Sequence, residues 1–345
     1  MAEDDPRVID KIDPKILGTL LSRRNPPPPI PLTATDEYLY GYHKMVEGVI
    51  QQIMTDCCKE TLTQLHGFTT EIIQIKGVDD NDITLYIDTP LEITNPVPCI
   101  YHIHGGGMGL LRASDASYVV TRGSLAARGC IVVGVEFRNA SGNHGNHPFP
   151  AGLNDCMSGL QWIHQNKTTR NISKVIVCGE SGGGNLSLAL CLKAKREGLL
   201  DLIDGVYARC PFIFGHWAEV DSPEWKSLPS LEANNGLALD CIGMGLLARA
   251  YTPSEEDRKN PLAWPYWASN DDLIGLPPHF IAVNDLDPLL DEGKAYFYKL
   301  LKAGVQTQLR TVHGTLHAMD TLAVDILHYA FKTTINSIVA FAKEL

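Results

Sequence analysis

The fold of this chain is decided by residues 174–196, which read KVIVCGESGGGNLSLALCLKAKR. The β-branched run over 174–178 predicts a buried strand, and the spacing of leucine and alanine predicts a helix over 185–197. Between them lie four glycines and Ser181. A strand that passes through a glycine-rich turn directly into a helix predicts that Ser181 stands at the carboxyl end of a strand in an α/β fold.

The alternation of strands and helices continues over most of the chain. Apolar β-rich runs and amphipathic stretches follow one another, which predicts a mostly parallel central sheet with helices on both faces. The first two runs are predicted to form an antiparallel edge. The expected strands are 70–75, 83–87, 99–104, 130–137, 174–178, 206–211, 280–283 and 306–312. The expected helices are 36–62, 114–128, 152–166, 185–197, 289–303 and about 320–343.

One stretch, 213–275, interrupts this alternation. It is rich in tryptophan and proline and contains one predicted helix, over 236–251. Insertions of this kind often cover a site at the carboxyl ends of the strands. We therefore expect a catalytic domain made of 61–212 and 276–345, a cap insertion at 213–275, and an N-terminal cap segment at 1–60. The alternative interpretation is that 213–275 is only a long loop with short elements of its own, and not a cap.

Composition restricts the ligands and the compartment. The 345 residues are 44% hydrophobic, and the net charge is −11. An acidic chain without a basic cluster is a poor binder of nucleic acids or anionic membranes, which favours neutral or cationic ligands. The nine cysteines show no zinc-type spacing and are expected to be small buried side chains in a reducing compartment. The acidic segment at residues 1–6 does not resemble a signal peptide, and no apolar stretch reaches 18 residues, so we expect a cytoplasmic protein.

The turn at Ser181 suggests a nucleophile. In a tight strand–turn–helix connection the serine hydroxyl is exposed above the sheet, at a helix N-terminus that favours developing negative charge. Glycines on either side remove side chains that would collide there. The alternative, a phosphate-binding loop, would require Gly-x-x-x-x-Gly-Lys-Ser/Thr, and that motif does not occur.

A second glycine-rich turn, His104-Gly105-Gly106-Gly107, follows the strand predicted at 99–104. Backbone N–H groups in such a turn can stabilise the negative oxygen formed during acyl transfer. We expect an oxyanion hole made by the N–H groups of Gly106, Gly107 and Gly182. His104 is expected to hold the loop by hydrogen bonds. Metal binding by His102 and His104 is the weaker alternative, and no metal or organic cofactor is expected.

A nucleophilic serine also needs a base and an orienting carboxylate, which follow it in the order serine, acid, histidine. Asp287 comes after the strand at 280–283 and is the expected acid, although Pro288 would also make it a good helix N-cap. Asp285 is the reserve candidate. His317 lies in the loop after the last strand and is the expected base, whereas His313 still belongs to the strand end.

These motifs together resemble the hormone-sensitive-lipase family of α/β-hydrolases, also called bacterial family IV esterases. The resemblance spans roughly residues 70–345 and includes Asp287-Pro288-Leu289 and Gly314-x-x-His317. It implies that the aspartate of Asp-Pro-Leu is the triad acid, which favours Asp287, and that a cap covers the site. The chain departs from the family at Glu180, where Asp or Thr is common, and at Gly182, where Ala is common.

The function expected from these residues is hydrolysis of small neutral esters with short acyl groups, acetyl to butanoyl, by Ser181, His317 and Asp287. An amidase or deacetylase on the same fold and a non-catalytic, receptor-like binder of small ligands are the alternatives. A homodimer is a further expectation.

Overall fold

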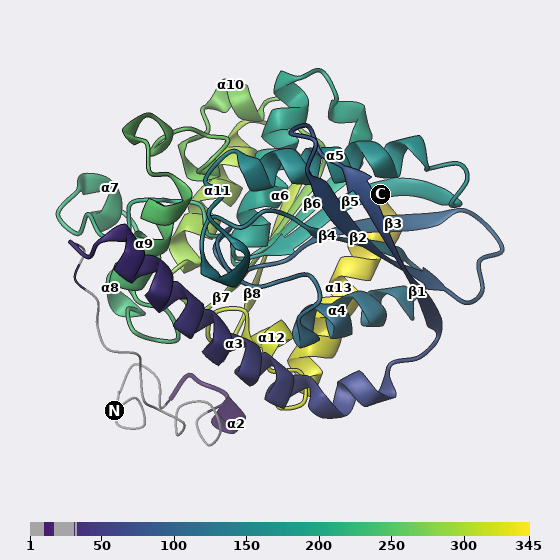
Figure 1. Cartoon of the computed structure of the whole chain (residues 1–345), viewed down its shortest axis with the longest axis horizontal. Coiled ribbons are helices and arrows are strands. Elements are labelled where there is room, and N and C mark those ends of the chain that lie inside the picture. The colour runs from purple at the N-terminus through teal and green to yellow at the C-terminus, as the bar shows by residue number, and fades with distance from the viewer. Residues whose placement is uncertain (1–9, 17–30, 32) are drawn as a thin grey trace.

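A computed structural model describes residues 10–16, 31 and 33–345, and its centre is an eight-stranded sheet (Figure 1). The strand order is β1-β2-β4-β3-β5-β6-β7-β8. The strands are β1 (Phe68–Lys76), β2 (Asp82–Pro90), β3 (Val97–Ile103), β4 (Ile131–Glu136), β5 (Ile172–Glu180), β6 (Gly205–Arg209), β7 (His279–Asn284) and β8 (Thr307–Val312). All eight coincide with a strand predicted from the sequence, and the mostly parallel α/β class is confirmed.

The strand directions follow from how the chain connects neighbours. β1 and β2 form an antiparallel pair at one edge, as predicted, and β2 is also antiparallel to β4. From β4 to β8 every pairing is parallel. Parallel strands direct all their carboxyl ends to one side of the sheet. The turns after β3, β5, β7 and β8, which carry the predicted site residues, therefore lie along the same edge.

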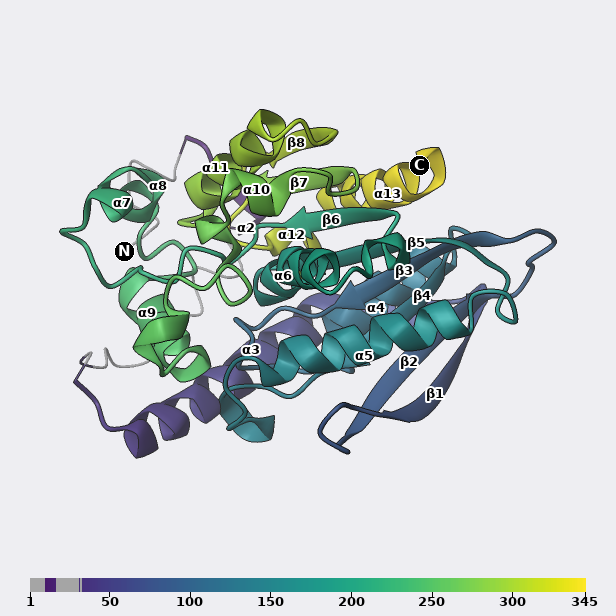
Figure 2. The same ribbon diagram turned by 90° about the horizontal axis from the view of Figure 1, so that it is seen from above.

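The strands bury their side chains alternately on the two faces. Tyr101 and Val177 belong to the core on one face, and Ile100 and Ile176 belong to the core on the other. Because successive residues of a strand point to opposite faces, an apolar run without alternation requires helices on both sides. This is the arrangement that Figure 2 shows when the sheet is seen from above.

Three helices, α5, α6 and α11, pack on the first face, while α4 and α13 pack on the second, with α3 against α4 (Figure 2). The long helices are α3 (Asp36–Gln64), α4 (Ala116–Ala126), α5 (Ala151–Gln165), α6 (Gly182–Arg196), α9 (Cys241–Tyr251), α11 (Leu290–Lys302) and α13 (His328–Glu344). The short ones are α2 (Pro14–Ile16), α7 (Pro223–Lys226), α8 (Ser230–Ala233), α10 (Asn270–Leu273) and α12 (Met319–Leu322).

Two helices differ from the prediction. The single helix expected over about 320–343 is divided into α12 and α13, because Asp325 turns toward α3. Its side chain accepts hydrogen bonds from the backbone N–H groups of Glu60 (2.8 Å) and Thr61 (3.0 Å). The helix expected from residue 236 begins only at Cys241, where the Asp240 side chain caps Gly243. Both differences involve polar contacts that apolar periodicity does not reveal: a long-range contact at Asp325 and a local cap at Asp240.

The segment 213–275 contains α7 to α10, and α9 of this segment lies against α3. Leu39 of α3 packs with Leu246 and Ala250 of α9, and Arg249 donates to the backbone oxygen of Ala34 at 2.8 Å. Figure 1 shows the N-terminal end of α3 beside α9. The expected N-terminal cap segment, 1–60, falls partly outside the described residues, at 1–9, 17–30 and 32.

All nine cysteines are buried, as expected for small apolar side chains. Within the described ranges, the helices are too short or too polar for a membrane crossing.

Candidate active site

Ser181 occupies the tight turn between β5, which ends at Glu180, and α6, which begins at Gly182. Its backbone has φ 55° and ψ −119°, a conformation that non-glycine residues rarely adopt. The turn is held by a hydrogen bond from the Ser181 N–H to the backbone oxygen of Arg209, at 2.9 Å. A Cβ atom on Gly183 would lie 2.6 Å from the backbone oxygen of His104, so a side chain at this position would push the two turns apart.

Three segments far apart in the sequence meet at this turn. His317 Nε2 lies 2.9 Å from Ser181 Oγ, and His317 Nδ1 lies 2.7 Å from Asp287 Oδ2. Asp287 is fully buried and His317 is nearly so. A carboxylate can only accept, so Nδ1 donates to Asp287, which leaves Nε2 free to accept the serine proton. The arrangement is a continuous hydrogen-bonded chain of serine, histidine and aspartate.

Asp287 contacts the histidine, but it is not the N-cap of α11, because that position belongs to Leu289. One carboxylate oxygen accepts from His317, and the other accepts from the backbone N–H of Leu289 at 2.9 Å, just before α11. The reserve candidate, Asp285, pairs instead with His313 at 3.0 Å, and 81% of the His313 side chain is exposed. Asp285 and His313 therefore form a separate pair at the surface.

Burial and charge compete at His317. Burial opposes the charged imidazolium and is the largest single influence, but Asp287 and Cys210 together outweigh it, so the pKa of His317 is raised well above its ordinary value. Cys210 also faces this pair and has a positive φ of 31° at the end of β6. Burial raises the pKa of the Cys210 thiol, which keeps it neutral beside the histidine.

The glycine-rich loop after β3 lies beside the serine turn. Gly106 and Gly107 both have positive φ values, 91° and 60°. A Cβ atom on Gly182 would lie 2.6 Å from the backbone nitrogen of Gly107, which places this nitrogen next to the start of α6. The N–H of Gly182 is in the first helical turn, where N–H groups have no acceptor within the helix. The structure thus places Gly107, and the loop that contains it, beside Gly182 at the start of α6.

His104 contributes to the shape of this loop. Its Nδ1 lies 3.0 Å from the backbone oxygen of Gly105, and its ring stacks on Phe137 at 4.2 Å. Burial lowers the pKa of His104 to about 3, so the ring is neutral. These contacts match the structural role expected for His104.

Several residues that sequence reasoning missed hold the His317 loop. Asn284, the last residue of β7, donates to Thr315 Oγ1 at 2.7 Å and to Asp320 Oδ1 at 3.2 Å, and accepts from the N–H of Ala318 at 3.2 Å. Ala318 itself has a left-handed conformation with φ 55°. Single Asn, Thr and Asp residues are common in loops, so the sequence gives no signal for this network.

The metal hypothesis for His102 and His104 can be compared with the positions of the side chains. Among the described residues, Cys210, Asp287 and His317 each place one possible ligand atom within 4.8 Å of the others. His317 and Asp287, however, already bond to each other and to Ser181. His102 and His104 do not belong to this group; burial lowers the pKa of both.

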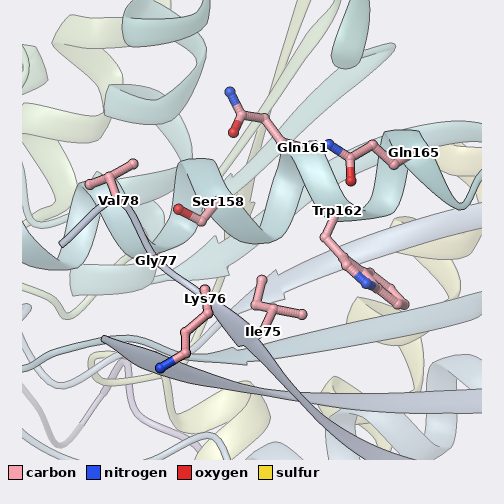
Figure 3. A pocket seen from close by; sticks show the side chains of 8 residues that line it. All are labelled: Ile75, Lys76, Gly77, Val78, Ser158, Gln161, Trp162 and Gln165. Carbon is pink, nitrogen blue, oxygen red and sulfur yellow. The ribbon is translucent and has the colours of Figure 1, made fainter. Parts of the chain in front are cut away.

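A cavity of about 300 Å³ lies away from this site, between α5 and the end of β1 (Figure 3). Trp162, Gln161 and Gln165 of α5 line one side of it, and Ile75 and Lys76 line the other. The hydroxyl of Ser158, which also lines it, donates to the backbone oxygen of Asn154. This cavity therefore has no activated nucleophile.

Comparisons with known proteins identify the fold family of this chain. Residues 100–321 match the family described as alpha/beta hydrolase fold. An arylesterase of Saccharolobus solfataricus is 30% identical over 72% of this chain and 76% of its own length. The carboxylesterase NlhH of Mycobacterium tuberculosis is 29% identical over 70% of this chain and 73% of its own length.

Two solved structures of esterases match this chain over nearly its whole length. Brefeldin A esterase, described as a bacterial homologue of human hormone-sensitive lipase, superposes with a TM-score of 0.93 and 37% identity, and the match covers 99% of this chain and 94% of that one. The esterase Est22 superposes with a TM-score of 0.87 and 33% identity, over 99% of both chains. This chain therefore belongs to the α/β-hydrolase fold family, within its hormone-sensitive-lipase-like group of carboxylic ester hydrolases.

Proposed function

We propose that this chain is a serine carboxylesterase in which Ser181 is the nucleophile, His317 the general base and Asp287 the orienting acid. The observation that carries the proposal is the hydrogen-bonded chain from Ser181 Oγ to His317 Nε2 (2.9 Å) and from His317 Nδ1 to Asp287 Oδ2 (2.7 Å). A serine in a strained turn with this orientation of the base has the arrangement needed for nucleophilic catalysis.

The reaction proceeds in two halves. Ser181 Oγ attacks the ester carbonyl carbon while His317 Nε2 takes its proton, and Asp287 stabilises the imidazolium that forms. The tetrahedral oxyanion accepts hydrogen bonds from the N–H groups of Gly106, Gly107 and Gly182, and each donor contributes about 3–4 kcal/mol to the transition state. His317 then protonates the leaving alcohol, and the same base activates a water molecule that releases the acid from Ser181.

We further propose that 213–275 and 1–60 form a cap, outside the catalytic domain made of 61–212 and 276–345, and that the acyl group is short. Support comes from α9, because a side chain on Gly107 would collide with Leu247 and would also lie 3.6 Å from Phe212. We call the loop His104-Gly105-Gly106-Gly107 the oxyanion loop. Apolar side chains that close around this loop leave little room for a long acyl chain. The substrate we expect is a small neutral ester. The cytoplasmic location, the homodimer and the absence of nucleic-acid binding stay predictions.

The test is to treat the full chain with a fluorophosphonate probe and to compare it with Ser181→Ala. We expect one label per chain on Ser181, hydrolysis of p-nitrophenyl butyrate, and neither in the folded Ser181→Ala variant. Near-normal turnover by Ser181→Ala would refute the mechanism. A wild-type chain that is neither labelled nor active would support the non-catalytic binder.

The same preparation tests the substrate class. The acetate and butyrate esters should turn over faster than the palmitate, and a p-nitroanilide should react more slowly than the matching ester. Faster palmitate hydrolysis would exclude the short-acyl proposal, whereas faster anilide hydrolysis would favour the amidase.

A further inference from the structure

Glu180, which precedes Ser181, is a buried carboxylate that faces away from the nucleophile toward the oxyanion loop. Only 1% of the residue is exposed. Its Oε1 accepts from the backbone N–H of Gly105 at 3.0 Å, and its Oε2 accepts from Arg209 Nη2 at 2.8 Å. Gly105 immediately precedes the two loop glycines proposed as donors to the oxyanion. Glu180 thus connects the serine turn directly to the loop.

Arg209, the partner of Glu180, makes two further connections. Its backbone oxygen accepts the Ser181 N–H at 2.9 Å, and its Nη1 donates to Thr321 Oγ1 at 2.7 Å. Thr321 bonds back to the oxygen of Ala318, the residue after His317, through its N–H at 3.0 Å and its hydroxyl at 3.2 Å. One buried arginine therefore contacts both the serine turn and the segment that follows the histidine.

We infer that the Glu180–Arg209 pair positions the oxyanion loop, Ser181 and the His317 segment relative to one another, and that Glu180 is a positioning residue for ester hydrolysis. This inference rests on the proposed function. Oxyanion donors act only if their geometry is fixed before the charge develops. A buried ion pair adds little to stability compared with apolar side chains of the same size, so stability alone does not account for this one.

Glu180→Gln is the first test, with Asp88→Asn as its matched control. Glutamine has one acceptor oxygen where Glu180 uses two, so either Gly105 or Arg209 loses its partner. Asp88 forms a comparably buried pair with Arg122 at 2.9 Å, between β2 and α4. The Asp88→Asn substitution therefore makes the same change, from carboxylate to amide, outside the site. A purely structural role predicts similar losses of Tm and of activity in both variants.

Positioning predicts a different result. Glu180→Gln should lose about tenfold or more in kcat/KM, mainly through kcat, while Asp88→Asn stays within about threefold of wild type. A trifluoromethyl ketone adds to serine and places an oxyanion in the hole, so its Ki should rise with Glu180→Gln by a factor similar to the loss in kcat/KM. Retained activity in Glu180→Gln, or an unchanged Ki beside a lost kcat/KM, would overturn the inference.

Thr321→Val is the second variant and carries the test if Glu180→Gln does not fold. It removes the Arg209 contact with nearly the same side-chain volume, so kcat should fall at unchanged KM; a kcat equal to wild type would overturn the inference. A wild-type chain without labelling or ester hydrolysis would instead reject the proposed function itself, which separates the two failures.

Discussion

At the scale of single residues, Gly182 shows why this chain departs from the alanine that is common in its family. A Cβ atom at this position would lie 2.5 Å from the backbone nitrogen of Met108 and 2.6 Å from that of Gly107. Both neighbours are backbone atoms, which cannot rotate away as the end of a side chain can. The oxyanion loop therefore approaches the start of α6 so closely that only glycine fits.

Gly182→Ala should consequently impair catalysis, even though alanine is acceptable elsewhere in the family. Displacement of the loop from the serine turn should lower kcat by about ten- to a hundredfold, because oxyanion donors are sensitive to small shifts. Steady-state kinetics with p-nitrophenyl butyrate measures this. Gly48→Ala, on α3 where a Cβ would meet nothing within 4 Å, is the control and should keep full activity. Equal activity in both variants would show that the loop can move at no cost.

The charge on His317 gives a prediction for the pH dependence. Only the neutral imidazole can take the Ser181 proton, and the pairing with Asp287 raises the pKa of His317 well above its ordinary value. The kcat/KM profile should therefore fall on the acid side at a pH above the ordinary value of about 6.5. Asp287→Asn should move this limb to lower pH and reduce the maximum rate. An acid limb below pH ~6 in the wild type would contradict the pairing.

At the scale of elements, two helices distant in sequence fix the oxyanion loop from outside the sheet. Glu47 of α3 is fully buried and accepts from the N–H groups of Leu111 (2.7 Å), which follows the loop, and Asn143 (2.6 Å), in the turn after β4. Leu247 of α9 covers Gly107 and Gly109. Helical periodicity predicted both helices, but not that a polar residue of one and an apolar residue of the other would meet the same loop.

Leu247→Ala tests the role of α9 in selectivity. Removal of the side chain above Gly107 should make room beside the oxyanion loop, so the ratio of hexanoate to acetate turnover should rise by about five- to tenfold. Rates with a series of p-nitrophenyl esters measure the ratio. Ile242→Ala, on the same helix with 46% of the residue exposed, is the control and should leave the ratio unchanged. An identical ratio in both variants would place the acyl group away from α9.

At the scale of the whole molecule, a buried carboxyl connects the insertion to α11. Glu292 of α11 accepts from the N–H of Ile213 at 2.6 Å and from Trp217 Nε1 at 2.8 Å, where the chain leaves β6 and enters the insertion. Burial raises the pKa of Glu292 to about 8, although these N–H donors favour its charged form. No cation pairs with Glu292 among the contacts of the described residues.

The raised pKa of Glu292 makes stability depend on pH. In the unfolded chain this carboxyl has its ordinary pKa of 4.5, whereas in the folded chain its pKa is about 8. Its contribution is therefore complete below pH 4.5 and is lost as the pH rises to about 8. In melting experiments between these limits, the Tm difference of Glu292→Gln minus wild type should increase with pH. A difference that stays constant would show that Glu292 is already charged in the folded chain.

The sequence alone predicted the order of strands and helices, the parallel sheet and the motifs of the candidate site. It could do so because apolar periodicity and glycine-rich turns are local signals, and because parallel strands direct their carboxyl ends to one edge. Tertiary structure alone decided that Asp287 contacts both His317 and the start of α11, and that Asp285 turns to the exposed His313. It also decided what Glu180 and Gly182 contact, because these partners come from β6 and from the loop between β3 and α4. Distances between such segments depend on how the layers pack, and no pattern along the chain records them.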